Sequence, residues 1–188
     1  TGGQTPLMLA QSLVGVGISI SNVTYTGSTQ SAGFFSDGLS EGLGLNTGVI
    51  LSSGRVSTAP GPNNSSSTTG SMGTPGDAQL ASIVGRPVSS LRDAAVLEFD
   101  FIPTGPLLSF SYVFASEEYP EFVGSSFNDA FALIVDGVNV ALIPNTSTAV
   151  TINNVNGNLN STYYNSNRPV INFGTSFDGF TTLLTAQA

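Results

Sequence analysis

Short stretches in which hydrophobic and polar residues alternate recur along the chain, and each predicts a β-strand. The predicted strands lie at 18–25, 49–51, 95–102, 107–115, 130–135, 138–143, 150–152 and 181–185. Gly, Pro, Asn and Asp separate them, as is typical of short connections. Asp136-Gly137 between two apolar stretches predicts a two-residue hairpin, because a type I′ turn needs positive φ at both positions. The pattern therefore predicts a mainly β, antiparallel sandwich or jelly-roll-like fold.

Two short segments have the signals of helices instead. Thr5-Pro6 precedes an apolar stretch, which places an N-cap and a proline at the first helical position. A second helix is predicted at Asp77–Val84, with Asp77 as its cap and Gly85 as its stop. One or two short helices are therefore expected beside the strands.

The polar segment Gly54–Gly76 is rich in Gly, Pro and Ser and is too long for a plain connection. It is either a mobile loop or a functional loop that is ordered partly by contacts elsewhere, and we favour the second interpretation. Neither an internal repeat nor a second linker divides the chain. We expect one domain over residues 1–188.

The composition points to an extracellular protein. Only 9% of the 188 residues are charged, so the surface must consist mainly of hydroxyl and amide groups. The net charge of −8 would repel phosphate backbones and anionic headgroups, which argues against a nucleic-acid partner. Cations are the expected small partners.

Several kinds of chemistry are excluded by missing residue types. The chain has no Cys, no His and no Lys, which excludes disulfides, thiol nucleophiles, Ser-His pairs, most transition-metal sites and lysine crosslinks. Any assembly is therefore expected to be noncovalent. Polar residues interrupt the apolar stretch 7–23, so we predict neither a membrane span nor an intact signal peptide there.

Three glutamates, Glu117, Glu118 and Glu121, lie close together in FASEEYPEFVGSSF (residues 114–127). The preceding strand places alternate apolar residues on its core face, and Pro120 then ends its ladder. The carboxylates are therefore expected at the rim of the sheet, where binding groups commonly lie.

Strand alternation places Asp129 on the same face as Phe131 and Leu133, which are expected to face the core. An unpaired charge in the core would destabilise the fold. Calcium takes oxygen ligands, so we predict a calcium site formed by Glu117, Glu118, Asn128 and Asp129. The alternative is that Asp129 accepts hydrogen bonds from the amides of 125–128 and pairs with an arginine, while the glutamates are solvated.

Glu98 and Asp100 lie opposite the apolar face of their strand, and a solvated face is the simplest interpretation. A bridge by a cation or an arginine is the alternative. A glycosidase needs two carboxylates at a suitable separation, usually with further polar and stacking groups. With no tryptophan and no third polar group in view, we expect no enzymatic activity.

Five segments resemble the choice-of-anchor L domain, a family of secreted and surface-attached bacterial proteins. They are GVGISISNVTYTG (15–27), GLNTGVILSSG (44–54), DAAVLEFDFIPTG (93–105), YVFASEEYPEFVGSSFNDAFALIVDG (112–137) and FDGFTTLLTA (177–186). The resemblance implies export, surface display and a β-rich module, and it supplies no catalytic residue.

Family members usually continue with further strands where this sequence stops at Ala188. Either those strands are absent from the sequence given, or the domain leaves a sheet edge open to a strand from another copy, with Val14–Tyr25 as a candidate donor. We therefore expect a non-enzymatic structural or adhesive subunit that assembles with copies of itself into a filament or matrix, with calcium as a stabilising ion. The alternative is a calcium-dependent, lectin-like module that binds surface glycans.

Overall fold

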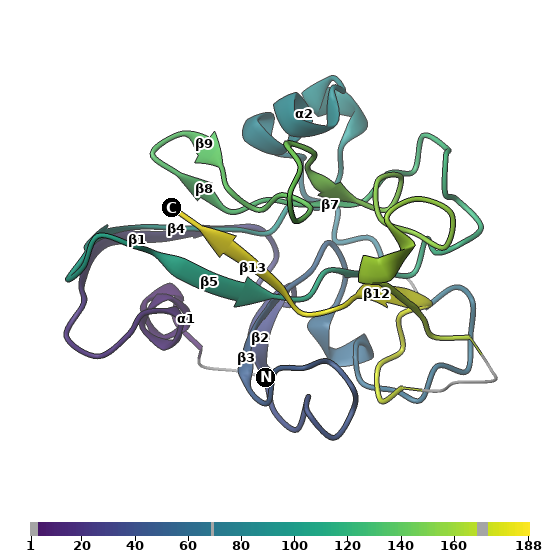
Figure 1. Cartoon of the computed structure of the whole chain (residues 1–188), viewed down its shortest axis with the longest axis horizontal. Helices are drawn as coiled ribbons and strands as arrows, with labels where there is room; N and C mark the ends of the chain where they lie inside the picture. The colour runs from purple at the N-terminus through teal and green to yellow at the C-terminus, as the bar shows by residue number, and fades with distance from the viewer. Residues whose placement is uncertain (1–3, 69, 169–172) are drawn as a thin grey trace.

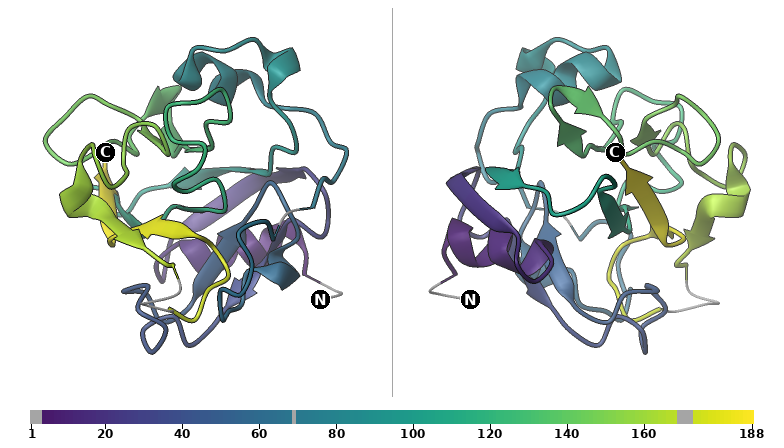
Figure 2. Two further views of the ribbon diagram at one scale, coloured as in Figure 1. Left: turned by 90° about the vertical axis from the view of Figure 1, so that its right-hand side faces the viewer. Right: turned by 60° about the vertical axis from the view of Figure 1, so that its left-hand side comes forward.

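The computed structural model describes residues 4–68, 70–168 and 173–188. It is mainly β with antiparallel strands, as predicted, and its helices α1 and α2 lie on opposite sides of the strands (Figures 1 and 2). The described strands form small separate sheets that do not close into a barrel, so the sandwich or jelly-roll arrangement stays a prediction.

Both predicted helices are confirmed. α1 spans Pro6–Leu13, and the Thr5 hydroxyl accepts a hydrogen bond from the Met8 N–H at 3.2 Å. α2 spans Ala78–Val84, its first turn is capped by the Asp77 carboxylate, and Gly85 ends it at φ 66°. No helix within the described residues is long and apolar enough to cross a membrane.

The strands pair two by two, apart from one three-stranded sheet. The pairs are β1 (Ser19–Thr26) with β4 (Val96–Ile102), β2 (Ala32–Phe35) with β3 (Gly48–Leu51), β5 (Ser109–Tyr112) with β13 (Leu184–Gln187), β7 (Ala130–Phe131) with β10 (Val150–Thr151), and β8 (Ile134–Val135) with β9 (Val138–Asn139). In the larger sheet, β12 (Gly179–Thr181) lies between β6 (Ala115–Ser116) and β11 (Tyr164–Ser166). All of these pairs are antiparallel.

The predicted hairpin at Asp136-Gly137 joins β8 to β9, with φ of 49° and 81° at its two residues. The predicted strand 107–115 is divided into β5 and β6, and only the start of 138–143 is a strand. The periodicity did not indicate β2 or β11. A glycine interrupts the four residues of β2, and β11 lies in a polar segment, so neither stretch alternates for long enough to be recognised.

The expected donor segment Val14–Tyr25 is not free in the single chain. Its strand β1 forms an antiparallel ladder with β4, which runs from Ser19 opposite Ile102 to Thr26 opposite Val96 with one irregularity between Ser21 and Thr24. Donation of this segment to another copy therefore stays a prediction, and it would require β1 to leave β4 of its own chain.

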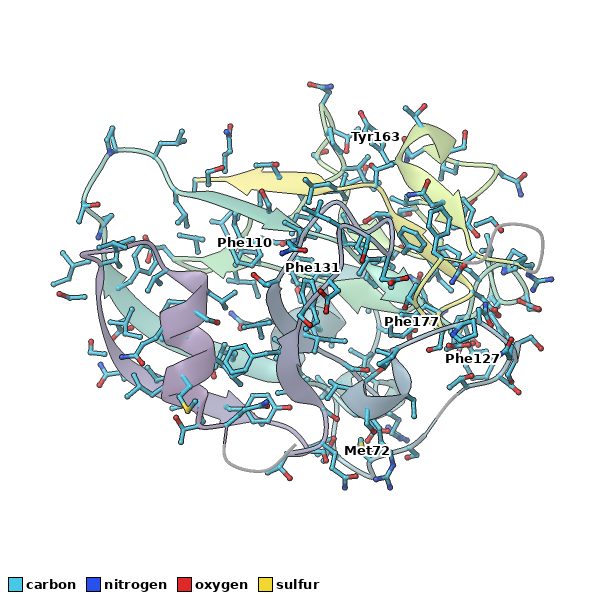
Figure 3. All side chains as sticks on the ribbon, turned by 90° about the horizontal axis from the view of Figure 1, so that it is seen from below. Met72, Phe110, Phe127, Phe131, Tyr163 and Phe177 are labelled. Carbon is cyan, nitrogen blue, oxygen red and sulfur yellow. The ribbon has the colours of Figure 1, made fainter. Side chains whose placement is uncertain are left out.

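The main core lies between the β5–β13 ribbon and the segment 140–155. Tyr112 and Phe114 are buried on the predicted core face, and they pack with a larger set of buried apolar side chains. That set is Tyr119, Ala141, Ile143, Val150, Ile152, Val155, Leu184 and Ala186. Phe110 and Phe131 lie against this cluster, near the middle of the molecule in Figure 3.

The long polar segment 54–76 is held by contacts with distant residues, in agreement with the interpretation we favoured. Its first half is bonded to the segment before β12: the Ser176 N–H donates to the Ala59 carbonyl at 2.8 Å, and the Gly61 N–H donates to the Gly174 carbonyl at 2.9 Å. Its second half surrounds the buried Asp93 carboxylate. The loop thus lies beside the end of the molecule that carries the acidic residues.

Candidate functional site: the acidic rim

The acidic rim, as we define it, is the loop Glu117–Asp129 together with Asp178. It begins where β6 ends, and Figure 3 shows Phe127, in the loop, and Phe177, next to Asp178 in the sequence, at the same end of the molecule. Tyr119 fixes the loop, because its ring is fully buried and its hydroxyl donates to the Val155 carbonyl at 2.5 Å. The charged groups of the rim are therefore held against the core.

Asp129 is directed inward, as its position in the strand alternation predicted, but within the described part of the chain neither an arginine nor the amides of 125–128 bond to it. Its Oδ2 accepts a hydrogen bond from the Ser116 hydroxyl at 2.8 Å, and the Ser116 oxygen accepts one from the Glu118 N–H at 2.9 Å. Burial raises the pKa of Asp129, and the Ser116 bond opposes that effect. The pKa of Glu118 is raised by burial and then by the negative charges of Asp129 and Glu121.

The three carboxylates among the four predicted calcium ligands do not form a metal-binding group within the described residues. The Asn128 side-chain oxygen accepts a hydrogen bond from the Asn153 N–H at 3.1 Å, which occupies it within the loop. Glu118 lies near Asp129, whereas Glu117 lies near Asp178. Within the described ranges, no group of three or more acidic side chains is placed so that it could hold a metal ion. Calcium binding by the predicted residues stays a prediction.

Glu117 and Asp178 lie near each other just beyond the end of the β6–β12 ladder, which the sequence did not indicate. In the β6–β12 ladder, Ser116 lies opposite Gly179 and Ala115 opposite Phe180. Continuing this register by one residue places Glu117 opposite Asp178. Like charges in directly opposite positions destabilise an antiparallel pair.

Both carboxylates of this pair are shielded from water. Asp178 is 2% exposed, and its Oδ1 accepts a hydrogen bond from the Asn63 side chain at 2.7 Å. Among the described residues, Asp178 Oδ2 and both carboxylate oxygens of Glu117 are buried without a hydrogen bond of normal geometry. Three of the four oxygens of the pair are therefore unsatisfied.

The electrostatics reflect this arrangement. Burial raises the pKa of Glu117 to about 7, with a further contribution from the negative charge of Asp178. The Thr68 N–H and the Ser176 hydroxyl, which lie nearby, lower it in part. Burial also raises the pKa of Asp178, while Asn63 opposes the rise. Burial therefore disfavours the charged form of both carboxyl groups.

Outside this pair, the rim offers an ion pair and an exposed aromatic pair. Arg168 and Glu121 are joined by a salt bridge at the surface. Phe122 and Phe127 are 41% and 60% exposed, and their rings meet edge to face with centroids 5.1 Å apart. The rim thus presents acidic and aromatic groups side by side.

Glu98 and Asp100 lie apart from the rim, on the exposed face of β4, as the solvated interpretation predicted. Asp100 accepts a hydrogen bond from the Asn22 side chain at 2.6 Å. The residues that sequence reasoning missed are Asp178, Ser176 and Asn63. The FDGF stretch around Asp178 carries part of the family resemblance, and nothing local to it indicates the nearby glutamate.

A family model described as the Choice-of-anchor L domain matches residues 3–188. No curated protein sequence matches the chain, and no solved structure does. A match over essentially the whole chain indicates a bacterial protein that is secreted or displayed at the cell surface, in a family of non-catalytic surface domains.

Proposed function

Because this chain belongs to the choice-of-anchor L domain family, we propose that it is a non-enzymatic structural or adhesive module outside the cell whose copies join by exchanging their N-terminal strand. In this proposal β1 of one copy pairs with β4 of the next. The observation that carries the proposal is the β1–β4 ladder itself, which joins the N-terminal segment to a strand far along the chain.

Exchange of β1 between copies would form the same strand contacts that the single chain already has. A ladder between distant segments of one chain has the same contacts when the two strands come from different copies, which makes domain swapping a low-cost route to assembly. The exchanged unit would be α1 with β1, because α1 packs on β1 as well as on β3 and β4. Gly27, directly after β1, has φ 143° and is a natural hinge.

The surface of this ribbon also suits assembly. The β1–β4 sheet has only two strands within the described residues, so each strand has one unpaired edge. The exposed positions of β1 are serine, asparagine and threonine. The sequence has no lysine, the residue that most often prevents pairing at the edge of a sheet. The irregularity between Ser21 and Thr24, and the exposed carboxylates of Glu98 and Asp100 on β4, would discourage edge-to-edge addition.

Paired cysteines test the proposal, since the natural sequence has none. Thr24 and Glu98 lie opposite each other in the β1–β4 ladder, and Thr185 and Ser111 lie opposite each other in the β5–β13 ladder. We expect oxidised Thr24→Cys/Glu98→Cys protein to give a ladder of covalent oligomers on a non-reducing gel at high concentration. The matched Ser111→Cys/Thr185→Cys protein should crosslink only within single chains. Intrachain crosslinking in both proteins would contradict strand exchange.

A second candidate function, glycan binding, is favoured by an open cleft of about 460 Å³ beside the start of the 54–76 loop. Asp37, Glu41 and Phe173 are among its lining residues. Carboxylates accept hydrogen bonds from sugar hydroxyls, and an aromatic ring supplies an apolar face. Binding on a glycan array that is lost in Asp37→Ala but retained in the exposed-site control Asp100→Ala would support this function. Equal binding by both variants, or none by the natural protein, would exclude this cleft.

A further inference from the structure

Among the described residues, neither Glu117 nor Asp178 forms an ion pair with a positively charged side chain. Lysine and histidine are absent from the sequence. Arg168 lies near enough to lower the pKa of Asp178, but its ion pair is with Glu121. The other arginines are engaged or exposed elsewhere: Arg55 bonds to Gln30, Arg92 bonds to the carbonyls of Ser89 and Leu91, and Arg86 is exposed after α2.

An unpaired buried charge is costly, and two opposed carboxylates with three unsatisfied oxygens are more so. Either a proton or a cation from solution can remove the repulsion. The unsatisfied Oδ2 of Asp178 belongs to a side chain that is 2% exposed, so bulk water does not solvate it. Buried carboxylate oxygens that face each other without hydrogen bonds of normal geometry are typical of a cation site, whereas the carboxylates of an acidic surface are solvated by water.

We propose that Glu117 and Asp178 bind a calcium ion at the end of the β6–β12 ladder, with the Ser176 hydroxyl as a further ligand. All three side chains offer oxygen, which calcium prefers, and none offers nitrogen or sulfur. The Ser176 hydroxyl donates its proton to the Thr58 carbonyl at 2.6 Å, so its lone pairs are available to a cation. Carbonyl groups and water would complete the coordination.

The site has a structural consequence for the 54–76 loop. Ser176 is bonded to Thr58, and Asp178 to Asn63, so two of the proposed ligands already contact this loop. A bound ion would tie β6, β12 and the loop together. This role is independent of strand exchange, which involves β1 and β4.

Terbium luminescence provides a direct test, because terbium occupies calcium sites and is sensitised by nearby tyrosines. Tyr119 and Tyr164 flank the ladder at Gly179, where an added Cβ would lie 2.9 Å and 2.7 Å from their rings, and the chain has no tryptophan. We expect sensitised emission that calcium displaces, with a calcium Kd of about 10⁻⁵ to 10⁻³ M. Glu117→Gln and Asp178→Asn should each weaken binding at least about tenfold, and the exposed-site control Glu98→Gln should not.

Two results would overturn the proposal. One is the absence of any calcium-displaceable emission up to about 10 mM calcium, well above the affinities of extracellular sites. The other is binding that survives Glu117→Gln but is lost in Glu118→Gln or Asp129→Asn, which would place the ion at the residues predicted from the sequence. If Asp178→Asn does not fold, Glu117→Gln and its control decide the question alone.

Discussion

Replacing Asp93 tests how the long polar loop is held. Asp93 is 6% exposed, and its carboxylate accepts four hydrogen bonds from the segment 71–74. The shortest two come from backbone N–H groups, at 2.7 Å from Thr74 and 3.0 Å from Met72. Asp93→Ala removes every acceptor and leaves these two donors unsatisfied.

The expected loss follows from those donors. An unsatisfied buried donor costs about 1 to 3 kcal/mol, and the loop is only partly buried, so Asp93→Ala should lower the free energy of unfolding by about 3 kcal/mol. Asp93→Asn keeps one acceptor oxygen and tolerates the φ of 57°, so it should cost about half as much. Asp100→Ala, on an exposed face, should change the free energy of unfolding by less than about 0.5 kcal/mol.

The pH dependence gives a second check on Asp93. Burial alone would raise the pKa of Asp93, but the bonds from Thr74, Met72 and Ser71 outweigh burial and hold it below its usual range. A lowered folded-state pKa means that the stabilisation is present above the unfolded pKa, near 3.9, and is lost as the pH falls through the folded value.

Urea denaturation followed by circular dichroism measures these differences in the free energy of unfolding. The gap between the natural protein and Asp93→Ala should be full at pH 7 and should shrink at pH 2 to 3. A loss below about 1 kcal/mol at pH 7, or a loss of the same size at both pH values, would refute this account of the loop.

Three further predictions follow from other parts of the structure. In the presence of a chelator, the pKa of Glu117 is about 7 in the folded protein, against an ordinary value of 4.5. A raised folded-state pKa means that the free energy of unfolding falls as the pH rises from 4.5 through 7. After allowance for partial exposure, the free energy of unfolding of Glu117→Gln should therefore be about 2 kcal/mol higher than that of the natural protein at pH 8, and no higher at pH 4. Equal free energies of unfolding at pH 8 would contradict a buried charge at Glu117. Tyr119→Phe removes the bond to the buried Val155 carbonyl and should cost about 1 to 2 kcal/mol in urea denaturation, and a cost near zero would mean that this bond does not fix the rim. Gly137→Ala, at φ 81° in the β8–β9 hairpin, should lower the melting temperature, and an unchanged temperature would argue against a type I′ turn.

The local features of the fold could be predicted from the sequence. Thr5, Asp77 and Gly85 mark helix ends through groups within a few residues of them, and Asp136-Gly137 marks its hairpin in the same way. Strand alternation identified the core face of β5 because only one of the two faces of this strand is buried. Each of these signals depends on the chemistry of neighbouring residues.

The site depends on pairing between distant segments, which the sequence does not encode locally. Glu117 meets Asp178 because β6 pairs with β12 in one register, and a shift of one residue would separate the two carboxylates. The sequence indicated that Asp129 needs a partner but not that Ser116, at the end of β6, donates a hydrogen bond to it. Acidic residues could be assigned to the rim, whereas their grouping required the three-dimensional structure.

Electron microscopy of the concentrated protein, with light scattering on the same samples, tests the central claim of self-assembly most directly. Strand exchange predicts fibres or a concentration-dependent series of oligomers, and it predicts their loss when residues 1–26 are deleted. A monodisperse monomer at every concentration, in the presence and absence of calcium, would contradict a structural subunit built by strand exchange.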